Sequence, residues 1–277
     1  MKSDERMRLH YIIEHAVRWS ESLAAIYFAA LAVVSGFRPL PQARRVRIVG
    51  ASVAAILIAW SAPWAPRVVR DWLPPVLILV GYQVSGWFFT NPSEGFERWL
   101  MATDRWLLGD PVTRFETWPA VLLAYLEVVY VGCFLLVPAG FALLWFGGRA
   151  DLADRYWTMV IAAEFGSFAP LAFVQTRPPW ALEPPPALRD RAVHRAAAWF
   201  VREFTIGANT FPSGHVAGSL AVAFAVLPAL PLAGSVLLGL ALSIAAACIV
   251  GRYHYVVDVV AGAGLVGAIF TVVRLIE

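Results

Sequence analysis

Long apolar runs separated by short polar connections dominate this chain of 277 residues. A helix that crosses the roughly 30 Å hydrocarbon core of a bilayer needs about 20 mostly apolar residues. By that measure the pattern predicts about eight spanning helices, at residues 22–37, 47–64, 73–90, 118–146, 155–175, 213–230, 233–252 and 256–275. We therefore expect an all-α polytopic transmembrane bundle, with residues 1–277 forming a single membrane domain.

Further stretches mix apolar with charged residues and are expected at the membrane surface. Residues 1–21 lack the short apolar core of a cleavable signal, so we expect an interfacial N-terminal helix there. Residues 91–117 place Trp99 and Trp106 among charged residues, which indicates tryptophans at headgroup depth. Residues 176–210 open with prolines and continue as a helix that carries several arginines.

Composition agrees with a membrane protein. Hydrophobic residues make up 60% of the chain and charged residues 15%, and the mean hydropathy is +0.66; soluble domains are closer to half apolar and a quarter charged. The net charge of +3 is small and scattered, which excludes a nucleic-acid partner. Cys133 and Cys248 lie inside apolar runs, as buried thiols do. We predict no metal site and no cofactor.

Polar residues replace the expected apolar ones at three places. Their sequences are Q-T-R-P-P at 175–179, F-P-S-G-H at 211–215 and G-R-Y-H-Y-V-V-D at 251–258. These segments fall at the end of the fifth predicted span, at the start of the sixth, and between the seventh and the eighth. Because successive spans alternate in direction, the three segments are expected on one side of the membrane, where they can meet in a single site.

In the third segment, His254 and Asp258 are four residues apart, so on a helix their side chains share one face. A carboxylate there can accept the proton of one imidazole nitrogen and leave the other nitrogen free as a nucleophile. Arg252 has a planar guanidinium that suits two phosphate oxygens. The alternative is a helix end that Arg252 and His254 anchor at the interface.

The second segment places Ser213 and Gly214 at a helix start, where backbone N–H groups have no partner within the helix and attract anions. The Ser213 hydroxyl can donate to an anion or simply cap the helix. His215 follows in the first turn of an apolar helix, where a histidine is costly unless it has a function. Near a phosphate it would protonate the departing oxygen as a general acid.

The first segment ends a span at Arg177, and Pro178 fixes the direction of the chain behind it. The Arg177 guanidinium is then placed to stabilise charge on phosphoryl oxygens; taken alone, it is more typical of an arginine that reaches for the interface. Two carboxylates, Glu127 and Glu164, lie inside predicted spans. They are expected to line a substrate cavity, as is Gln175, or to pair with an arginine.

Together the three segments resemble the signature motifs of the type-2 phosphatidic acid phosphatase superfamily, which are Lys-x6-Arg-Pro, Pro-Ser-Gly-His and Ser-Arg-x5-His-x3-Asp. The similarity lies in residues 177–178 and 212–215 and in the pair His254 and Asp258. It implies that residues 155–275 form the motif-bearing catalytic part of a six-helix core. The aromatic segment before them is similar to that of the inositol-phosphorylceramide-synthase-like branch.

Two cations of the family pattern are missing. Pro170 stands where the first motif has its lysine, and Cys248 stands where the third motif has its arginine. Arg252 lies one helical turn after Cys248 and can supply the lost charge if that turn is helical. For the lysine, the candidates that could reach the site are Gln175, Arg189, Arg191 and Arg195.

The resemblance implies that His254, oriented by Asp258, attacks phosphorus and forms a phosphohistidine without a metal ion. It implies that His215 protonates the leaving group. The developing charge would be stabilised by a phosphate-binding set that consists of Arg177, Ser213, Gly214 and Arg252.

The leading hypothesis is an integral membrane lipid phosphatase acting on a phosphatidate or a polyprenyl phosphate. The first alternative is a phosphotransferase that moves a phosphorylated headgroup to an alcohol, and the second is a non-catalytic transporter or assembly factor. The expected partners are the lipid substrate and membrane lipids, with no obligate protein partner. The resemblance implies a bacterial-type inner or cell membrane with an extracytoplasmic active site.

Overall fold

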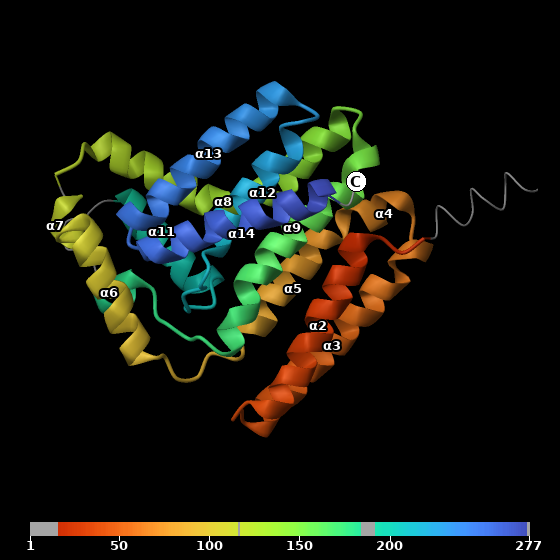
Figure 1. Ribbon diagram of the computed structural model, residues 1–277, viewed down its shortest axis with the longest axis horizontal. Helices are drawn as coiled ribbons and strands as arrows, with labels where there is room; N and C mark the ends of the chain where they lie inside the picture. Colours follow the sequence, from red (N-terminus) through yellow and green to blue (C-terminus); the bar gives the residue numbers. More distant parts are fainter. Residues whose placement is uncertain (1–15, 116, 184–191, 276–277) are drawn as a thin grey trace, which may run out of the picture.

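The computed structural model describes residues 16–115, 117–183 and 192–275, which form α-helices joined by turns and loops (Figure 1). In chain order the helices are α2 (Trp19–Phe37), α3 (Gln42–Ser61), α4 (Arg67–Trp72), α5 (Pro74–Gly86), α6 (Glu94–Leu108), α7 (Pro111–Arg114), α8 (Ala120–Phe146), α9 (Ala153–Phe168), α10 (Pro179–Leu182), α11 (Ala192–Phe204), α12 (Gly214–Val226), α13 (Pro231–Val250) and α14 (Val256–Leu275). Short 3-10 turns lie at Ala62–Trp64, Ala150–Leu152 and Ala169–Ala172. Within these residues there is no β-strand, so the predicted all-α fold is confirmed.

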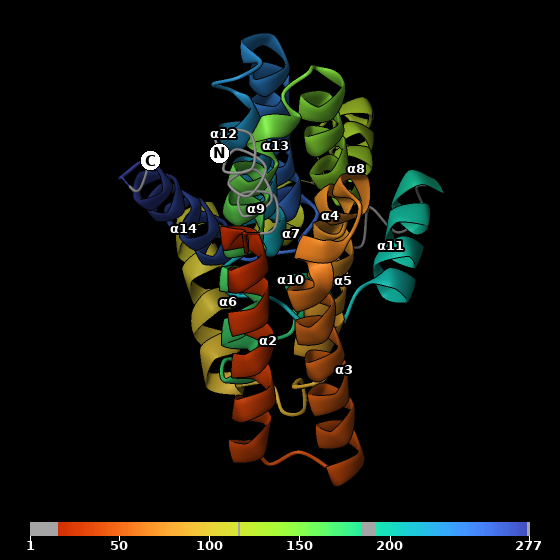
Figure 2. The same ribbon diagram turned by 90° about the vertical axis from the view of Figure 1, so that its right-hand side faces the viewer.

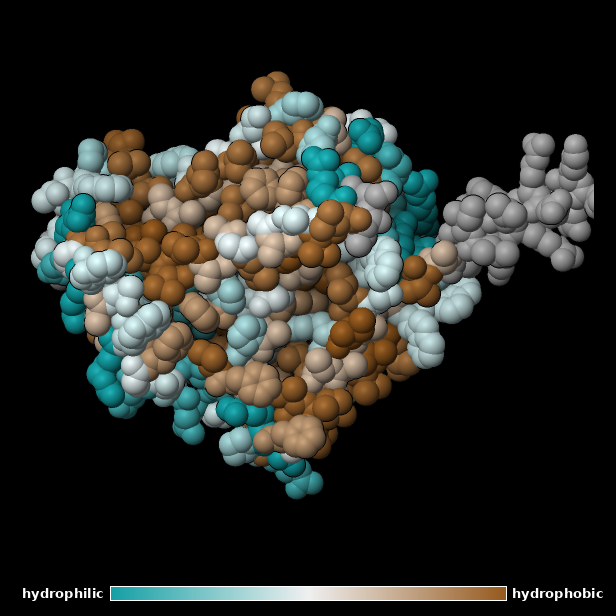
Figure 3. Space-filling view, in the orientation of Figure 1, coloured by the Kyte–Doolittle hydropathy of each residue, from teal (hydrophilic) through white to brown (hydrophobic). Residues whose placement is uncertain are grey.

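Five helical segments of the described chain are long and apolar enough to cross a bilayer. They are α2, α3 with the turn that follows it (Gln42–Trp64), α8, α13 and α14. With 27 residues, α8 rises about 40 Å and so exceeds the roughly 30 Å core, which requires it to tilt or to project. Figure 3 shows apolar side chains over much of the visible face and polar ones gathered toward its margins. The chain is therefore a polytopic membrane protein.

The other three predicted spans also form helices, but shorter ones. α5, α9 and α12 have 13, 16 and 13 residues, which corresponds to about 20–24 Å. α9 gives way to a 3-10 turn that contains Pro170, and α12 ends two residues before Pro228. Proline lacks the N–H that would continue the helix and clashes with the preceding turn. All eight predicted segments are thus helical, and proline shortens two of them.

α12 occupies the centre of the bundle, where it packs against α8, α9, α13 and α14 (Figures 1 and 2). All but two of its 13 residues are buried. Small residues let the neighbouring helices approach closely: a Cβ added to Gly140 of α8 would lie 2.4 Å from Cγ1 of Val222. The helix that carries His215 in its first turn is therefore fixed by packing against these four neighbouring helices.

α2 and α3 form an antiparallel pair on one flank of the molecule (Figures 1 and 2). Tyr27 of α2 stacks on Phe165 of α9 with 3.9 Å between ring centroids, and its hydroxyl donates to the Gly81 carbonyl of α5 at 3.2 Å. None of the three polar segments lies in this pair. The pair of α2 and α3 therefore packs against the outer side of α9 and does not contribute to the site.

The predicted interfacial segments are described in part. Residues 1–15 lie outside the described residues, and α2 already begins at Trp19. The segment 91–117 contains α6, in which Trp99 and Trp106 are exposed while Glu97 and Asp104 are buried. The segment 176–210 ends in α11, which packs along α8 at the side of the bundle (Figure 2).

Gly234 marks the closest approach of α13 to the end of α12. A Cβ on Gly234 would lie 2.2 Å from the Cα atom of Leu227, and backbone atoms cannot rotate away. We expect Gly234→Ala to lower the thermal unfolding temperature of the detergent-purified protein, because overpacking costs about 1–3 kcal/mol. Gly239→Ala in the same helix is the matched control, since its Cβ would meet no atom within 4 Å. Equal unfolding temperatures for the two variants would contradict this packing.

Candidate active site

The three polar segments lie next to one another in the structure. Nδ1 of His215 is 3.2 Å from Nε2 of His254, and Nδ1 of His254 is 3.4 Å from Oδ2 of Asp258. An antiparallel bridge joins Thr176, next to Arg177, to Asn209, just before the second segment. Side chains that are remote along the chain therefore form one connected group.

The start of α14 fixes the position of Asp258. The helix begins at Val256, so His254 lies in the turn before it and not on its face as the spacing predicted. The Tyr255 N–H donates to Oδ2 of Asp258 at 3.0 Å, and an acidic third residue commonly caps a first turn in this way. The His254 N–H donates to the Cys248 carbonyl at 2.9 Å. The histidine and the carboxylate thus face each other because the turn and the helix start are both held.

These contacts assign the protons of the two imidazoles. The Asp258 carboxylate accepts the proton on Nδ1 of His254, which leaves a lone pair on Nε2. His215 must then donate its Nδ1 proton to that lone pair, and its own Nε2 is unprotonated. Nε2 of His215 is buried without a hydrogen-bond partner in the described part of the chain. The group consists of one nucleophilic nitrogen and one proton donor beside it.

Asn209 is a site residue that the sequence analysis missed. Its Nδ2 donates to Oδ2 of Asp258 at 2.9 Å and to Oγ1 of Thr176 at 3.1 Å, and its side chain is almost fully buried. It therefore joins the first and second polar segments to the carboxylate of the third. A polar residue three positions before Pro212 was the available signal, but many loop asparagines simply support a turn.

α12 begins at Gly214 with Ser213 as its cap, which is one of the two roles predicted for Ser213, and anion binding at this helix start stays a prediction. Oγ of Ser213 accepts the Val216 N–H at 3.4 Å as an N-terminal cap, and the Gly214 N–H donates to Oγ1 of Thr210 at 3.2 Å. Thr210, Gly214 and His215 all line one cavity. The positive end of the helix dipole therefore opens beside the histidines. The Ser213 hydroxyl is engaged as a cap, and its contact with phosphate stays a prediction.

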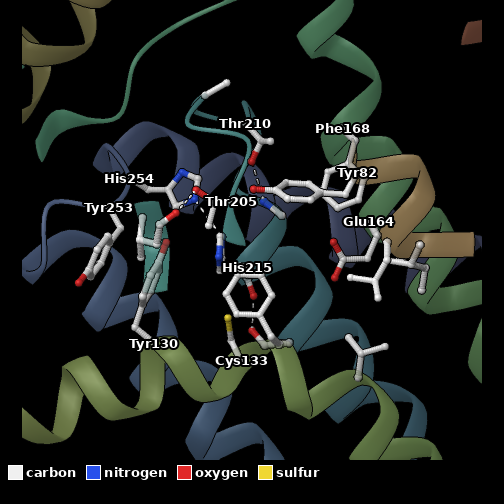
Figure 4. Close-up of a pocket in the computed structure, with 18 of the residues that line it drawn as sticks. Tyr82, Tyr130, Cys133, Glu164, Phe168, Thr205, Thr210, His215, Tyr253 and His254 are labelled. Carbon is white, nitrogen blue, oxygen red and sulfur yellow. Dashed lines mark hydrogen bonds between the residues drawn. The ribbon is translucent and has the colours of Figure 1, made fainter. Parts of the chain in front are cut away.

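Both histidines line a cavity of about 160 Å³ that is enclosed by mainly apolar and aromatic side chains (Figure 4). In Figure 4 the two imidazoles face the cavity from one side, and the Glu164 carboxylate faces it from the other. No lysine or arginine of the described chain lines it. Nor do the described residues contain a group of three His, Cys, Asp or Glu side chains suited to a metal ion.

The two predicted phosphate-binding arginines do not line this cavity. Arg177 bonds to Glu97 through Nε at 3.0 Å and Nη2 at 2.7 Å, and 40% of its side chain is exposed. Arg252 is buried at the end of α13 with a φ of +60°, and its guanidinium reaches Asp104 at 3.2 Å and Glu183 at 3.3 Å. The turn at Arg252 is not helical, so the condition for it to replace the motif arginine is not met. Phosphate binding by either arginine stays a prediction.

α6 supplies the carboxylates that hold these arginines. Glu97 and Asp104 are seven residues apart, or about two turns, so they share one face of the helix, and both are buried. Burial raises the pKa of Glu97, but the hydrogen bonds from Arg177 outweigh it and hold that pKa below its usual value. Burial raises the pKa of Asp104 to about 6, which the hydrogen bond from Val256 and the charge of Arg252 offset only in part.

The three predicted cavity residues occupy different positions. Gln175 is buried and accepts two backbone N–H groups of the turn after α5, at 2.8 and 3.0 Å, so it holds that turn and does not line the cavity. Glu127 accepts from the Tyr253 hydroxyl and lies 2.8 Å from Nδ1 of His194 in α11, behind the cavity wall. Glu164 lines the cavity itself.

Asn209 offers a test of the buried carboxylate. We expect Asn209→Ala to lower the free energy of unfolding by about 1–3 kcal/mol, because Asp258 loses a donor. Asn209→Asp is expected to destabilise more at neutral pH, since two carboxylates then face each other, and to recover as the pH falls and the introduced carboxyl becomes a donor. Thermal unfolding in detergent across pH 4–8 measures both effects. A pH-independent deficit for Asn209→Asp would show that this contact is wrong.

Comparison with known families and proteins bears on this geometry. The sequence model described as the PAP2 superfamily matches residues 98–272, which run from α6 into α14 and include all three polar segments. No curated protein and no solved structure matches the chain. The matched range covers more than half of the sequence and contains Asp258 and both histidines. The chain therefore belongs to the PAP2 superfamily.

Proposed function

We propose that this membrane protein cleaves the phosphate ester of a lipid through a phosphohistidine formed on His254, with water as the acceptor. Membership of the PAP2 superfamily supports a phosphatase-type function related to lipids. One observation carries the finer proposal: Asp258, His254 and His215 form a hydrogen-bonded row, with contacts of 3.4 and 3.2 Å, at the wall of a cavity inside apolar helices.

The first half of the reaction uses the protons as the contacts assign them. Substrate phosphate enters between the imidazoles and replaces their direct contact. A proton from the solvent is first added at the free Nε2 of His215, because a neutral imidazole is too weak an acid to protonate an alkoxide. A bond then forms between Nε2 of His254 and phosphorus while the ester bond breaks, and the departing oxygen takes the Nδ1 proton of His215, which leaves a neutral ring. Asp258 stabilises the positive charge that develops on His254, and the first turn of α12 faces the phosphoryl oxygens.

The second half restores the enzyme. A water molecule gives a proton to Nδ1 of His215 while its oxygen attacks phosphorus, and the bond to Nε2 of His254 breaks. Phosphate leaves, and both histidines regain their starting protons. The proton that His215 gives up in the first half is returned in the second, and the proton added at Nε2 leaves with the phosphate.

Transfer of a phosphorylated headgroup to an alcohol is the second candidate, and a specific observation favours it. A phosphate monoester carries about −1.5 to −2 charges at neutral pH, whereas a diester carries one. Among the described residues no lysine or arginine lines the cavity, so its walls suit a diester better. A non-catalytic role is disfavoured, because a transporter gains nothing from a buried histidine pair with an orienting carboxylate. An extracytoplasmic site in a bacterial-type cell membrane stays a prediction.

The nucleophile can be tested directly. We expect His254→Ala to abolish release of phosphate from phosphatidate in mixed micelles with chelator present, while its unfolding temperature falls no further than that of Asn209→Ala, which removes another donor to Asp258. Wild-type protein mixed with radiolabelled substrate should yield an acid-labile, base-stable phosphoprotein that His254→Ala does not form. Vanadate at millimolar concentration should inhibit, since it adopts the geometry of phosphorus in the transition state. Full turnover by His254→Ala would contradict the proposal.

The role of His215 predicts a dependence on the leaving group. General acid catalysis contributes about 10²–10⁴-fold when the departing oxygen is a poor leaving group. We expect His215→Gln to lose activity of that order on an alkyl ester, and much less on a nitrophenyl ester of the same chain length, whose oxygen needs no proton. His254→Ala, inactive on both, is the control. Equal losses of His215→Gln on the two esters would contradict proton donation by His215.

A further inference from the structure

Glu164 is a buried carboxylate that the reaction above does not use. It projects from α9, is 9% exposed and lines the cavity opposite the two histidines (Figure 4). In the described part of the chain no side chain or backbone group forms a hydrogen bond or ion pair with it. A carboxylate in an apolar bundle is costly unless a partner compensates its charge. A cationic group bound in the cavity would compensate that charge.

The neighbouring helix leaves room for this carboxylate. A Cβ on Gly218 of α12 would lie 2.0 Å from Oε1 of Glu164, and one on Gly214 would lie 3.4 Å from Oε2. The two glycines are four residues apart and so lie on the same face of α12. Glu164 is thus seated in a notch of the helix that carries His215, and its oxygens remain directed at the cavity.

Aromatic rings line the space between Glu164 and the histidines. Phe168 lies one turn after Glu164, and its ring centroid is 5.2 Å from that of Tyr82. Farther along, Tyr130 stacks on His215 at 4.8 Å, and Phe134 meets the same imidazole edge-on at 5.4 Å. Ring faces attract cations, most strongly where water is excluded. The cavity thus has a carboxylate at one end, two imidazoles at the other, and rings between them.

The remaining polar groups do not favour a sugar or polyol. The Thr205 hydroxyl donates to the Val201 carbonyl at 2.6 Å, and the Ser219 hydroxyl donates to that of His215 at 2.7 Å. The Tyr253 hydroxyl donates to Glu127. A polyol would need a separate partner for each of its hydroxyls, and with these three donors engaged only the hydroxyls of Tyr82, Tyr130 and Thr210 are left in the cavity lining. An ammonium group without hydroxyls needs only the carboxylate and the rings.

We propose that Glu164 and the surrounding rings form a recognition site for an ammonium-bearing headgroup, so that the substrate is a zwitterionic lipid phosphodiester. This inference rests on the proposed phosphohistidine chemistry for the position of the phosphate. A volume of about 160 Å³ suits a headgroup, because pockets that hold drug-sized molecules measure roughly 300–1,000 Å³. The acyl chains stay outside the cavity.

The reaction on such a lipid is balanced by the same groups. Nε2 of His254 bonds to phosphorus while the bond from phosphorus to the lipid oxygen breaks, and that oxygen takes the proton of His215. The headgroup stays on the phosphorus, held by Glu164. A water or alcohol oxygen then displaces His254, and its proton returns to His215. The negative phosphodiester and the positive ammonium group cancel, so the substrate itself adds no net charge to the cavity.

Binding to the inactive His254→Ala protein tests the headgroup site without any turnover. The probes are choline phosphate and 3,3-dimethylbutyl phosphate, in which carbon replaces the ammonium nitrogen, so the two differ in charge but hardly in shape. A maltoside detergent avoids competing ammonium groups. We expect calorimetric titration to give a Kd for the neutral analogue that is about tenfold or more above that for choline phosphate. In His254→Ala/Glu164→Gln this ratio should fall to near one.

Two further variants distinguish an effect of the Glu164 charge from an effect on folding. Gly218→Ala in the His254→Ala background keeps the charge but displaces the carboxylate, and should reduce the ratio. It also serves if Glu164→Gln does not fold. Glu203→Gln removes an exposed carboxylate of α11 and is the matched control, in which the ratio should stay unchanged.

The outcomes distinguish this inference from the proposed function. If choline phosphate does not bind, if the two probes bind equally, or if Glu164→Gln keeps the full ratio, the ammonium site is wrong, whether or not the protein forms a phosphohistidine. If the ratio behaves as expected but no labelled phosphoprotein forms from any lipid, the site is real and the proposed chemistry is wrong.

Discussion

The carboxylate of Asp258 is completely buried among apolar helices, and the polar groups near it are arranged around its charge. A buried charge is tolerated only when donors replace the water that it lost. Here they are a backbone N–H at the start of α14, the amide of Asn209 and the imidazole of His254. Two of the donors belong to the third polar segment and Asn209 lies just before the second, while Thr176 of the first segment accepts a hydrogen bond from Asn209. Compensating one charge therefore also assembles the site.

α6 plays the same part for the positive charges. Its acidic face binds Arg177 and Arg252, and Asp104 also accepts the first N–H of α14 at 2.9 Å. Removing one partner of a buried ion pair costs more than the pair itself contributes, because the other charge is left uncompensated. The loops that contain Arg177 and Arg252 are therefore fixed by α6, which carries no reacting group. The PAP2 match begins within this helix, which agrees with its place in the core.

The sequence was informative where local spacing decides the outcome. The apolar runs predicted every long helix, and proline accounts for the early ends of α9 and α12. His254 and Asp258 could be paired from their spacing, and Ser213 and Gly214 from the rules of helix starts. The arginines were harder, because a guanidinium goes to the nearest buried carboxylate, and Glu97 and Asp104 are about 80 and 150 residues away from them along the chain. The role of Asn209 depends on packing between helices, which no local pattern encodes, and so does the choice for Glu164 between lining the cavity and pairing with an arginine.

The contact of 3.2 Å between the imidazoles has a consequence for selectivity. While the rings touch, the reactive lone pair of His254 is masked by the proton of its neighbour. Only a group that can part them, with one atom to accept a proton and another to receive the nitrogen, unmasks the nucleophile. A tetrahedral phosphate meets both requirements, whereas a water molecule or a fatty acyl carbonyl that reaches the cavity meets one. The resting enzyme therefore does not react with the other components of the surrounding membrane.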